Sequence, residues 1–372
     1  MKITGAVLER TGDPTPYATS RPLSVVELEL DPPGPREVLV RMEAAGVCHS
    51  DLSVVDGNRV RPVPMLLGHE GAGIVEETGS EVRGLTPGQR VVMTFLPRCE
   101  NCAGCATGGI RPCVAGSASN EQGTLLDGGI RLHRGSESVL HHLGVSAFAT
   151  HTVVDERSVV PVGDDIPASV AALLGCAVLT GGGAVLNAGK PAPGQRVAVV
   201  GLGGVGMAAL ITALALDDVE VVGVDGVGHK LRQAEKLGAV AAYTPAEALD
   251  AGLRADIVIE AAGNARAFET AVEMTDAGGS TITVGLPAPS ARSLISPLAL
   301  VAGGRRIIGS YLGSAVPSRD VQIFADLWRR SKLPVETLVS DTVRLDNINQ
   351  AMDNLASGTA LRQIIDLDGV QP

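Results

Sequence analysis

Short alternations of apolar and polar side chains fill the first 150 residues and are interrupted by glycine and proline. Residues 37–43, 73–77 and 89–93 show this pattern most clearly. A period of two, bounded by turn-forming residues, predicts short β-strands with one buried face. We therefore predict a β-rich N-terminal domain.

The pattern changes from about residue 193 to continuous apolar strands separated by alanine-rich helical stretches. The predicted strands are residues 196–200, 219–224, 255–259 and 280–284. Strands that are apolar on both faces and alternate with helices are typical of a parallel, doubly wound sheet. The tail has helix-like patterning from Phe324 onward. It then has a predicted strand at 361–367, which we expect to return to the first domain.

The chain has 372 residues, which is too long for a single small core and favours two domains. We predict a discontinuous β-rich domain formed by residues 1–177 and 321–372. The doubly wound α/β domain, residues 178–320, is then an insertion within it.

The net charge of the chain excludes some classes of partner. Thirty Lys and Arg residues stand against 41 Asp and Glu residues, a net charge of −11. Such a charge repels nucleic acids and anionic membrane surfaces. The N-terminus becomes charged again before a signal-peptide core can form, and we expect no apolar run of the roughly 20 residues that a membrane helix needs. We therefore expect a cytoplasmic protein without nucleic-acid or membrane partners.

Four of the six cysteines lie in one short run, namely Cys99, Cys102, Cys105 and Cys113. Four sulfurs with no open position are typical of a structural zinc site. Disulfides are the alternative, but nothing marks the chain as secreted, and this close spacing on a glycine-bearing loop suits metal chelation better. Zinc is favoured over iron because only zinc lacks a redox task.

The other two cysteines, Cys48 and Cys176, are far apart in the sequence, and His69 can complete a set with them. Two cysteines and one histidine leave a fourth metal position open for water or substrate, which is the composition of a catalytic zinc site. Each residue alone has a plainer explanation, as a buried thiol or as a hydrogen-bonded histidine at a turn. We expect two zinc ions per chain, one catalytic and one structural.

A glycine-rich motif follows the predicted strand at 196–200 and precedes a helical stretch; its glycines are Gly201, Gly203, Gly204 and Gly206. They permit a tight turn and bring a pyrophosphate close to a helix N-terminus. Asp225 follows the next strand, where a carboxylate can bind both ribose hydroxyls of NAD and repels the 2′-phosphate of NADP. Alternatively, Asp225 only begins a turn before Gly226. We expect NAD(H) as the cofactor, with Lys230 as a weaker contact to the ribose.

The sequence combines ligands for an open zinc site with a dinucleotide motif. In this it resembles the zinc-dependent medium-chain alcohol dehydrogenases, over nearly the whole length of the chain. The sequence Gly68-His69-Glu70-Gly71, with Gly73, is similar to the zinc signature of that family. Residues 116–152 look like the long pocket loop of its liver-type, class III-like branch, which is typically dimeric.

The resemblance implies a GroES-like catalytic domain and a Rossmann domain. It also implies oxidation of an alcohol, most of all a primary or aromatic one, to an aldehyde or ketone with NAD. The implied assembly is a homodimer, with a homotetramer as the alternative.

The resemblance also implies a role for each matched residue. Cys48, His69 and Cys176 would bind the catalytic zinc. Glu70 would stand behind the zinc, and Asp51 would orient His69. Ser50 would pass the alcohol proton toward the nicotinamide ribose. The remaining implied cofactor contacts are Thr180 and Val205 at the nicotinamide, and His49 and Arg362 at the pyrophosphate.

Two features depart from the family pattern. Ser53 stands where liver-type members often have the histidine that ends the proton relay, so the relay must end in solvent or in another group. Phe95 matches a pocket aromatic, but His142 and Arg59 stand where many members have apolar walls. If His142 and Arg59 face the pocket, the substrate carries a polar or anionic group. The alternative is that both side chains turn to solvent.

Three other functions are compatible with parts of this pattern. The liver-type loop keeps open a dehydrogenase that acts on the adduct of formaldehyde with a thiol. A non-catalytic nucleotide-binding protein has the same fold, but retention of Cys48, His69, Glu70 and Cys176 counts against it. The third is a scaffold in which zinc occupies only the four-cysteine site.

Overall fold

The computed structural model describes residues 1–369, which form two compact units. The first unit contains Met1–Cys176 and the C-terminal part of the chain from Glu336; the second is Ala177–Val335. The second unit extends beyond residue 320, the boundary used above. It does so because helix α11 (Pro317–Arg329) contacts helix α5 (Leu179–Gly183).

The first unit contains a closed five-stranded barrel and a seven-stranded sheet. The barrel has the order β1 (Lys2–Leu8), β2 (Leu23–Leu30), β7 (Leu132–Arg134), β8 (Glu137–His141) and β4 (Met65–Leu66). The sheet has the order β10 (Val159–Val162), β6 (Arg90–Met93), β5 (Gly71–Thr78), β3 (Glu37–Val47), β18 (Arg362–Asp366) and β17 (Val339–Val343). Its seventh strand, β9 (His151–Asp155), pairs with β3.

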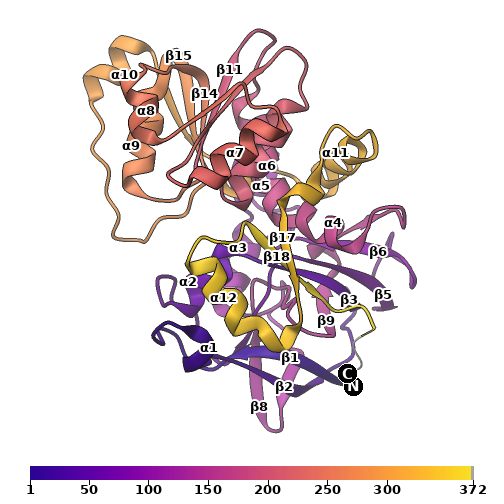
Figure 1. Ribbon diagram of the computed structural model, residues 1–372. Coiled ribbons are helices and arrows are strands. Elements are labelled where there is room, and N and C mark those ends of the chain that lie inside the picture. The colour runs from indigo at the N-terminus through magenta and orange to yellow at the C-terminus, as the bar shows by residue number, and fades with distance from the viewer. Residues whose placement is uncertain (370–372) are drawn as a thin grey trace. The chain divides into compact units, whose positions relative to one another are not determined.

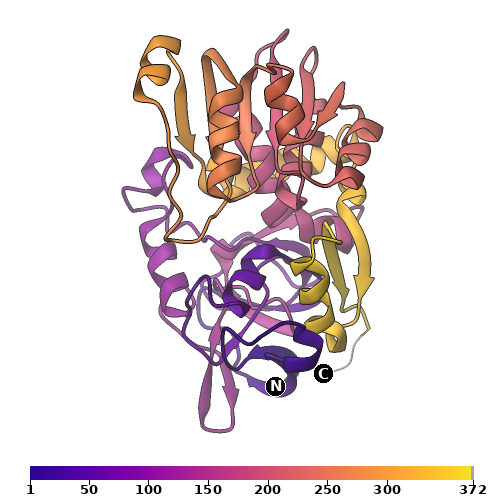
Figure 2. The same ribbon diagram turned by 60° about the vertical axis from the view of Figure 1, so that its left-hand side comes forward.

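The strands predicted at 37–43, 73–77 and 89–93 are confirmed as β3, β5 and β6. Residues 116–152, likened above to the long pocket loop of the liver-type branch, contain helical and strand elements. Helix α3 (Val114–Gln122) leads into the β7–β8 hairpin, which Figure 2 shows as a narrow projecting ribbon. The hairpin forms because Leu132 and Val139 pair across it and are buried in the core of the barrel.

The C-terminal strand returns to the first unit, as its sequence predicts. Strand β18 pairs antiparallel with the end of β3, with Ile364 opposite Gly46 and Gln363 opposite Val47, and Figure 1 shows both strands. A C-terminal strand thus lies beside the residues of β3 that immediately precede Cys48. This pairing positions Arg362 for the site described below.

The second unit is the predicted doubly wound α/β domain. Its sheet has the order β13 (Ala241–Tyr243), β12 (Glu220–Val224), β11 (Arg196–Val200), β14 (Ala255–Glu260), β15 (Thr275–Thr283) and β16 (Arg306–Gly309). All neighbouring strands are parallel. The strands β11, β12 and β14 are mostly apolar and buried because helices cover the sheet (Figures 1 and 2). The helices between the strands are α6 (Gly204–Leu214), α7 (Gly228–Leu237), α8 (Pro245–Asp250), α9 (Ala265–Met274) and α10 (Pro297–Gly303).

One helical segment is longer and more apolar than expected. Ala168–Gly189 has 22 residues and contains an 18-residue stretch with a mean hydropathy of 1.9, so the expectation that no apolar run reaches membrane-spanning length was wrong. In that stretch, 89% is buried inside the structure, which is typical of the core helix of a globular protein. It contains α4 (Ala168–Leu173), a π-helical turn at Leu174–Val178, α5 and a second π-helical stretch at Ala184–Gly189.

Candidate functional site

Three segments of the first unit bring Cys48, His69 and Cys176 together. Cys48 lies between β3 and helix α2 (His49–Val55), His69 lies between β4 and β5, and Cys176 lies in the π-helical turn. Their ligand atoms and a Glu70 carboxylate oxygen all lie within 4.8 Å of one another, and all four residues are buried. These donor atoms are therefore close enough to share one metal ion.

Gly175 allows the segment that carries Cys176 to approach β6. A Cβ atom at this position would overlap the carbonyl oxygen of Met93, so a larger residue would push the turn away. Single π-helical turns inside longer helices are frequent at functional sites. Here the turn places the Cys176 Sγ 3.4 Å from the His69 Nε2.

The imidazole of His69 is held by three neighbours. Its Nδ1 lies 2.9 Å from Asp51 Oδ1, and the rings of Phe95 and His142 contact it edge-on at centroid distances of 5.6 and 5.5 Å. A carboxylate can only accept at Nδ1, which places a ring proton on Nδ1 and makes Nε2 the nitrogen that would bind a cation. Asp51 is fully buried and also accepts the backbone N–H of Cys48 at 3.0 Å.

The two thiols and the imidazole carry protons that a metal ion could replace. Contact with Cys176 lowers the pKa of Cys48, whereas contact with Cys48 and burial raise the pKa of Cys176, so the pair shares one proton. Burial lowers the pKa of His69, but the charges of Asp51 and Cys48 outweigh it and raise that pKa well above its ordinary value. Metal binding at such a site displaces these protons.

Glu70 and Arg362 lie behind the three ligands. Arg362 is 2% exposed, and its Nε is 3.5 Å from Glu70 Oε1. Among the described residues neither carboxylate oxygen of Glu70 has a hydrogen bond. Burial raises the pKa of Glu70 to about 7, although the charge of Arg362 opposes this shift. A buried carboxylate without hydrogen bonds, next to two thiols and an imidazole, fits a site built for a cation.

His142 belongs to this cluster, which its sequence position does not indicate. Its side chain is 1% exposed, and its Nδ1 lies 3.2 Å from Asp51 Oδ1. The alternative that His142 turns to solvent is therefore wrong. Arg59 is half-buried.

The serines of α2 lie directly after Cys48. Ser50 is half-buried, and the Ser53 hydroxyl donates to the Ser50 carbonyl oxygen at 2.9 Å. The Ser53 hydroxyl is thus engaged with the helix backbone. His49, the first residue of α2, is exposed.

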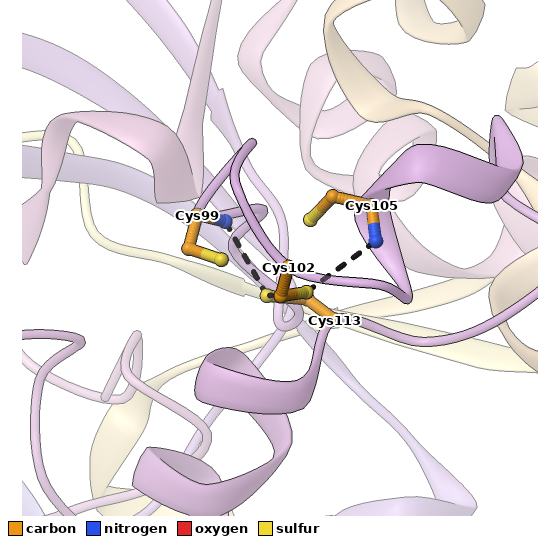
Figure 3. A group of neighbouring side chains, drawn as sticks. All are labelled: Cys99, Cys102, Cys105 and Cys113. Atoms are coloured by element: carbon orange, nitrogen blue, oxygen red, sulfur yellow. Dashed lines mark hydrogen bonds between the residues drawn. The ribbon is translucent and has the colours of Figure 1, made fainter.

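The four remaining cysteines form a second cluster, drawn in Figure 3. The Sγ atoms of Cys102 and Cys113 are 4.0 Å apart, and backbone N–H groups donate to both. The N–H groups of Val114 and Cys105 lower the pKa of Cys102 to about 5, which favours its thiolate form. Four converging sulfurs on a turn fit a tetrahedral structural zinc.

The glycine-rich motif in the second unit connects β11 to α6. Gly201 has φ +91°, a conformation that glycine adopts without strain, and Gly203 caps the helix. Asp225 follows β12; its Oδ2 accepts the Leu202 N–H at 2.7 Å and its Oδ1 accepts the Val227 N–H at 2.9 Å. Asp225 is therefore hydrogen-bonded to the glycine-rich loop and also begins a turn.

The other predicted cofactor residues of this unit lie near that loop. The Lys230 Nζ is 3.9 Å from Asp225 Oδ2. Thr180 lies in α5 and Val205 in the first turn of α6, and these two helices are in contact. Val205 and Lys230 are only half-buried.

The sequence matches two family descriptions in the order expected. Residues 34–164 match the alcohol dehydrogenase GroES-like domain, and residues 204–329 match the zinc-binding dehydrogenase domain. A Mycobacterium tuberculosis protein named "Putative alcohol dehydrogenase D" is 34% identical over 375 residues, which cover 98% of this chain and 100% of that relative.

Solved structures agree with this assignment. An alcohol dehydrogenase zinc-binding domain protein from Burkholderia ambifaria is 31% identical, with a TM-score of 0.91. Benzyl alcohol dehydrogenase from Acinetobacter calcoaceticus is 30% identical, with a TM-score of 0.89. Both alignments cover 98% of this chain and 99% of the other. The chain belongs to the zinc-dependent medium-chain alcohol dehydrogenase family.

Proposed function

We propose that this chain oxidises primary or aromatic alcohols to aldehydes by hydride transfer to NAD, and catalyses the reverse reduction. The buried set of Cys48, His69 and Cys176, with Asp51 behind His69, carries this proposal. Aromatic alcohols are included because the chain is similar over 98% of its length to a benzyl alcohol dehydrogenase.

In this proposal Cys48, His69 and Cys176 hold a catalytic zinc, and the four clustered cysteines hold a structural zinc. A zinc ion at the first site would supply Lewis-acid chemistry that lowers the pKa of an alcohol. Asp51 and Phe95 contact the His69 ring and would hold its Nε2 toward the ion. Both contacts hold the metal ligand in one orientation, which favours a defined open position.

Ser50 accepts the alcohol proton and passes it on. It lies two residues after Cys48, in the first turn of α2. Ser53 does not continue the relay because its hydroxyl donates to the Ser50 carbonyl oxygen. We propose that the proton leaves toward the nicotinamide ribose and then solvent. The rate of hydride transfer should then depend only weakly on pH near 6.5, the ordinary pKa of histidine.

The proposed cofactor is NAD(H). The Asp225 carboxylate stands at the glycine-rich loop, where it would accept the ribose hydroxyls and repel a 2′-phosphate. Thr180 and Val205 are assigned to the nicotinamide and Lys230 to the adenosine ribose. His49 and Arg362 remain the proposed pyrophosphate contacts.

We propose a homodimer formed through the free side of β16 and the segment before it. Strand β16 ends the sheet order, and this stretch exposes apolar side chains at Leu294 (90%), Leu298 and Val301. Such a patch beside an open strand edge is typical of a protein interface. Sedimentation of the wild type and of Val301→Asp tests it: a dimer that dissociates on substitution supports this surface, whereas a tetramer or an unaffected dimer contradicts it.

A spectrophotometric screen for NADH formation tests the function. Primary, aromatic, secondary and carboxylated alcohols are offered with NAD or NADP, and zinc content is measured on the same preparation. We expect turnover with NAD and about two zinc ions per chain. Formaldehyde is added with and without a thiol, because thiol-dependent turnover alone would identify the adduct dehydrogenase. No turnover with any alcohol would refute the proposal.

A substitution of Arg59 tests whether the substrate carries a charge. We compare kcat/KM for a plain alcohol and its ω-carboxylate analogue in Arg59→Ala. A fall in the preference for the carboxylate supports a substrate contact of Arg59. An unchanged ratio removes Arg59 from the pocket.

A further inference from the structure

Glu260 ties together two loops at the carboxyl edge of the parallel sheet. It is the last residue of β14 and is 1% exposed. Its Oε1 accepts the Gly263 N–H at 2.7 Å, and its Oε2 accepts the hydroxyl of Thr283, the last residue of β15, at 2.7 Å. A carboxylate is costly to bury unless donors satisfy it, and here one donor comes from the loop after β14 and the other from the end of β15.

The backbone of Glu260 strengthens the same connection. Its carbonyl oxygen accepts the N–H groups of Val284 at 2.9 Å and Gly285 at 3.2 Å. The two loops approach so closely that a Cβ on Gly285 would overlap the backbone of Gly263. No side chain separates them, so the Glu260 hydrogen bonds fix their spacing.

The loop after β14 also contacts the glycine-rich loop. A Cβ on Gly201 would overlap the backbone of Ala262, and the Ala261 N–H donates to the Val200 carbonyl oxygen at 2.8 Å. The ends of β11, β14 and β15 thus form one packed edge. A shift of either tied loop would change the surface that this edge presents.

The sheet order indicates which part of a dinucleotide lies over the tied loops. Dinucleotides bind across the carboxyl ends of such a sheet, with the pyrophosphate at the glycine-rich loop. Asp225, assigned to the adenosine ribose, follows β12 on one side of β11, and β14 and β15 lie on the other side. The nicotinamide half therefore extends over the ends of β14 and β15.

We propose that Glu260 is a positioning residue for the nicotinamide half of the cofactor. It acts through the loops after β14 and β15, whose spacing it fixes, and does not itself contact the dinucleotide. This inference rests on the proposed use of NAD.

The chain offers a matched pair of substitutions in one strand. Thr283→Val removes the hydroxyl that donates to Glu260, and Thr283→Ser retains it. Thr281→Val is the control, because Thr281 lies in the same strand, β15, but its hydroxyl lies 2.6 Å from that of Thr275 and does not contact Glu260. Glu260→Ala tests the carboxylate directly.

Calorimetric titrations of the full-length variants with NADH and with ADP-ribose separate the two halves of the cofactor. A hydrogen bond to a charged group contributes enough free energy that we expect the Kd for NADH to rise about tenfold in Thr283→Val. The Kd for ADP-ribose should change less than about twofold, because Asp225 and the glycine-rich loop are unaltered. Thr283→Ser should restore NADH binding, and Thr281→Val should lower Tm without changing either Kd.

The NADH and ADP-ribose affinities of these variants decide whether Glu260 positions the cofactor. Equal weakening of NADH and ADP-ribose in Thr283→Val would mean that Glu260 only supports the fold, and unchanged NADH affinity would mean that the loops need no such tie. Either result overturns this inference and leaves NAD-dependent function intact. A wild-type chain that binds ADP-ribose but not NADH overturns both proposals. If Glu260→Ala does not fold, the Thr283 series still decides.

Discussion

Replacing Asp51 by asparagine should weaken metal binding without removing a metal ligand. The carboxylate accepts two hydrogen bonds, from the Nδ1–H of His69 at 2.9 Å and the backbone N–H of Cys48 at 3.0 Å, and the His142 Nδ1 lies 3.2 Å from it. An asparagine of the same shape has only one acceptor oxygen. Its amide nitrogen must then face one of these two donors.

The expected loss follows from this geometry. One hydrogen bond to a buried charged acceptor is lost, which is worth about 1.5–3 kcal/mol. This corresponds to a fall in zinc affinity of roughly 10- to 100-fold, the range observed when residues that orient metal ligands are replaced. If the amide faces His69, the ring can also change tautomer and turn its Nε2–H toward the metal position.

Competition with a chromophoric chelator measures this zinc affinity, and Co²⁺ substitution reports the ligand geometry by its absorption spectrum. The control is Glu37→Gln, because Glu37 is also buried in the first unit but pairs with Arg131 away from the metal residues. Both variants should lose thermal stability, and only Asp51→Asn should lose affinity at the catalytic site. Equal zinc affinities in the two variants would refute the role assigned to Asp51.

Three further predictions test other parts of the molecule. Asp225→Ala should raise the ratio of kcat/KM for NADPH to that for NADH about tenfold or more, because a carboxylate that accepts ribose hydroxyls is lost; an unchanged ratio contradicts this. Burial lowers the pKa of His141 to about 3, so the unfolded chain binds a proton below about pH 6.5 that the folded chain does not, and stability falls as pH falls. Lowering the pH from about 7.5 to about 5 should therefore lower the free energy of unfolding by about 2 kcal/mol, which urea titration measures. The same change of pH should destabilise His141→Gln less, and an equal loss in the variant would exclude His141 as the cause. Cys102→Ser should lower Tm, whereas Cys176→Ser should fold, bind NADH and lose one zinc and all turnover; the reverse pattern would mean that the two metal sites are wrongly assigned.

Local sequence patterns predicted the parts of the fold that depend on local interactions. Strand β11 and the glycine-rich turn after it were predicted because a buried strand, a tight turn and a helix start each need particular residues in sequence. The four-cysteine cluster was predicted for the same reason, since a short loop must supply all of its ligands. Such features need no knowledge of distant segments.

Contacts between distant segments could not be predicted in this way. Nothing in the sequence indicates that His142 reaches Asp51, because the contact depends on the path of the chain through β8 and the turn after it. The π-helical turn at Cys176 was also missed, since the surrounding apolar residues are equally compatible with a regular helix. Glu260 gave one faint signal, a charged residue at the end of an apolar strand, but one of its two donors, the Thr283 hydroxyl, comes from the end of another strand.

The charges around Cys48, His69 and Cys176 explain what the polar residues next to these three side chains contribute. The two buried carboxylates have their own partners: Glu70 faces the Arg362 guanidinium, and Asp51 accepts hydrogen bonds from the N–H groups of His69 and Cys48. The two thiolates have no such partner, and a divalent cation would neutralise them. Without a metal ion they must share a proton, which the opposite pKa shifts of Cys48 and Cys176 reflect. Since Arg362 faces Glu70 and hydrogen bonds satisfy Asp51, a divalent ion would match the two thiolates of this buried site, whereas a monovalent ion would leave one thiolate uncompensated.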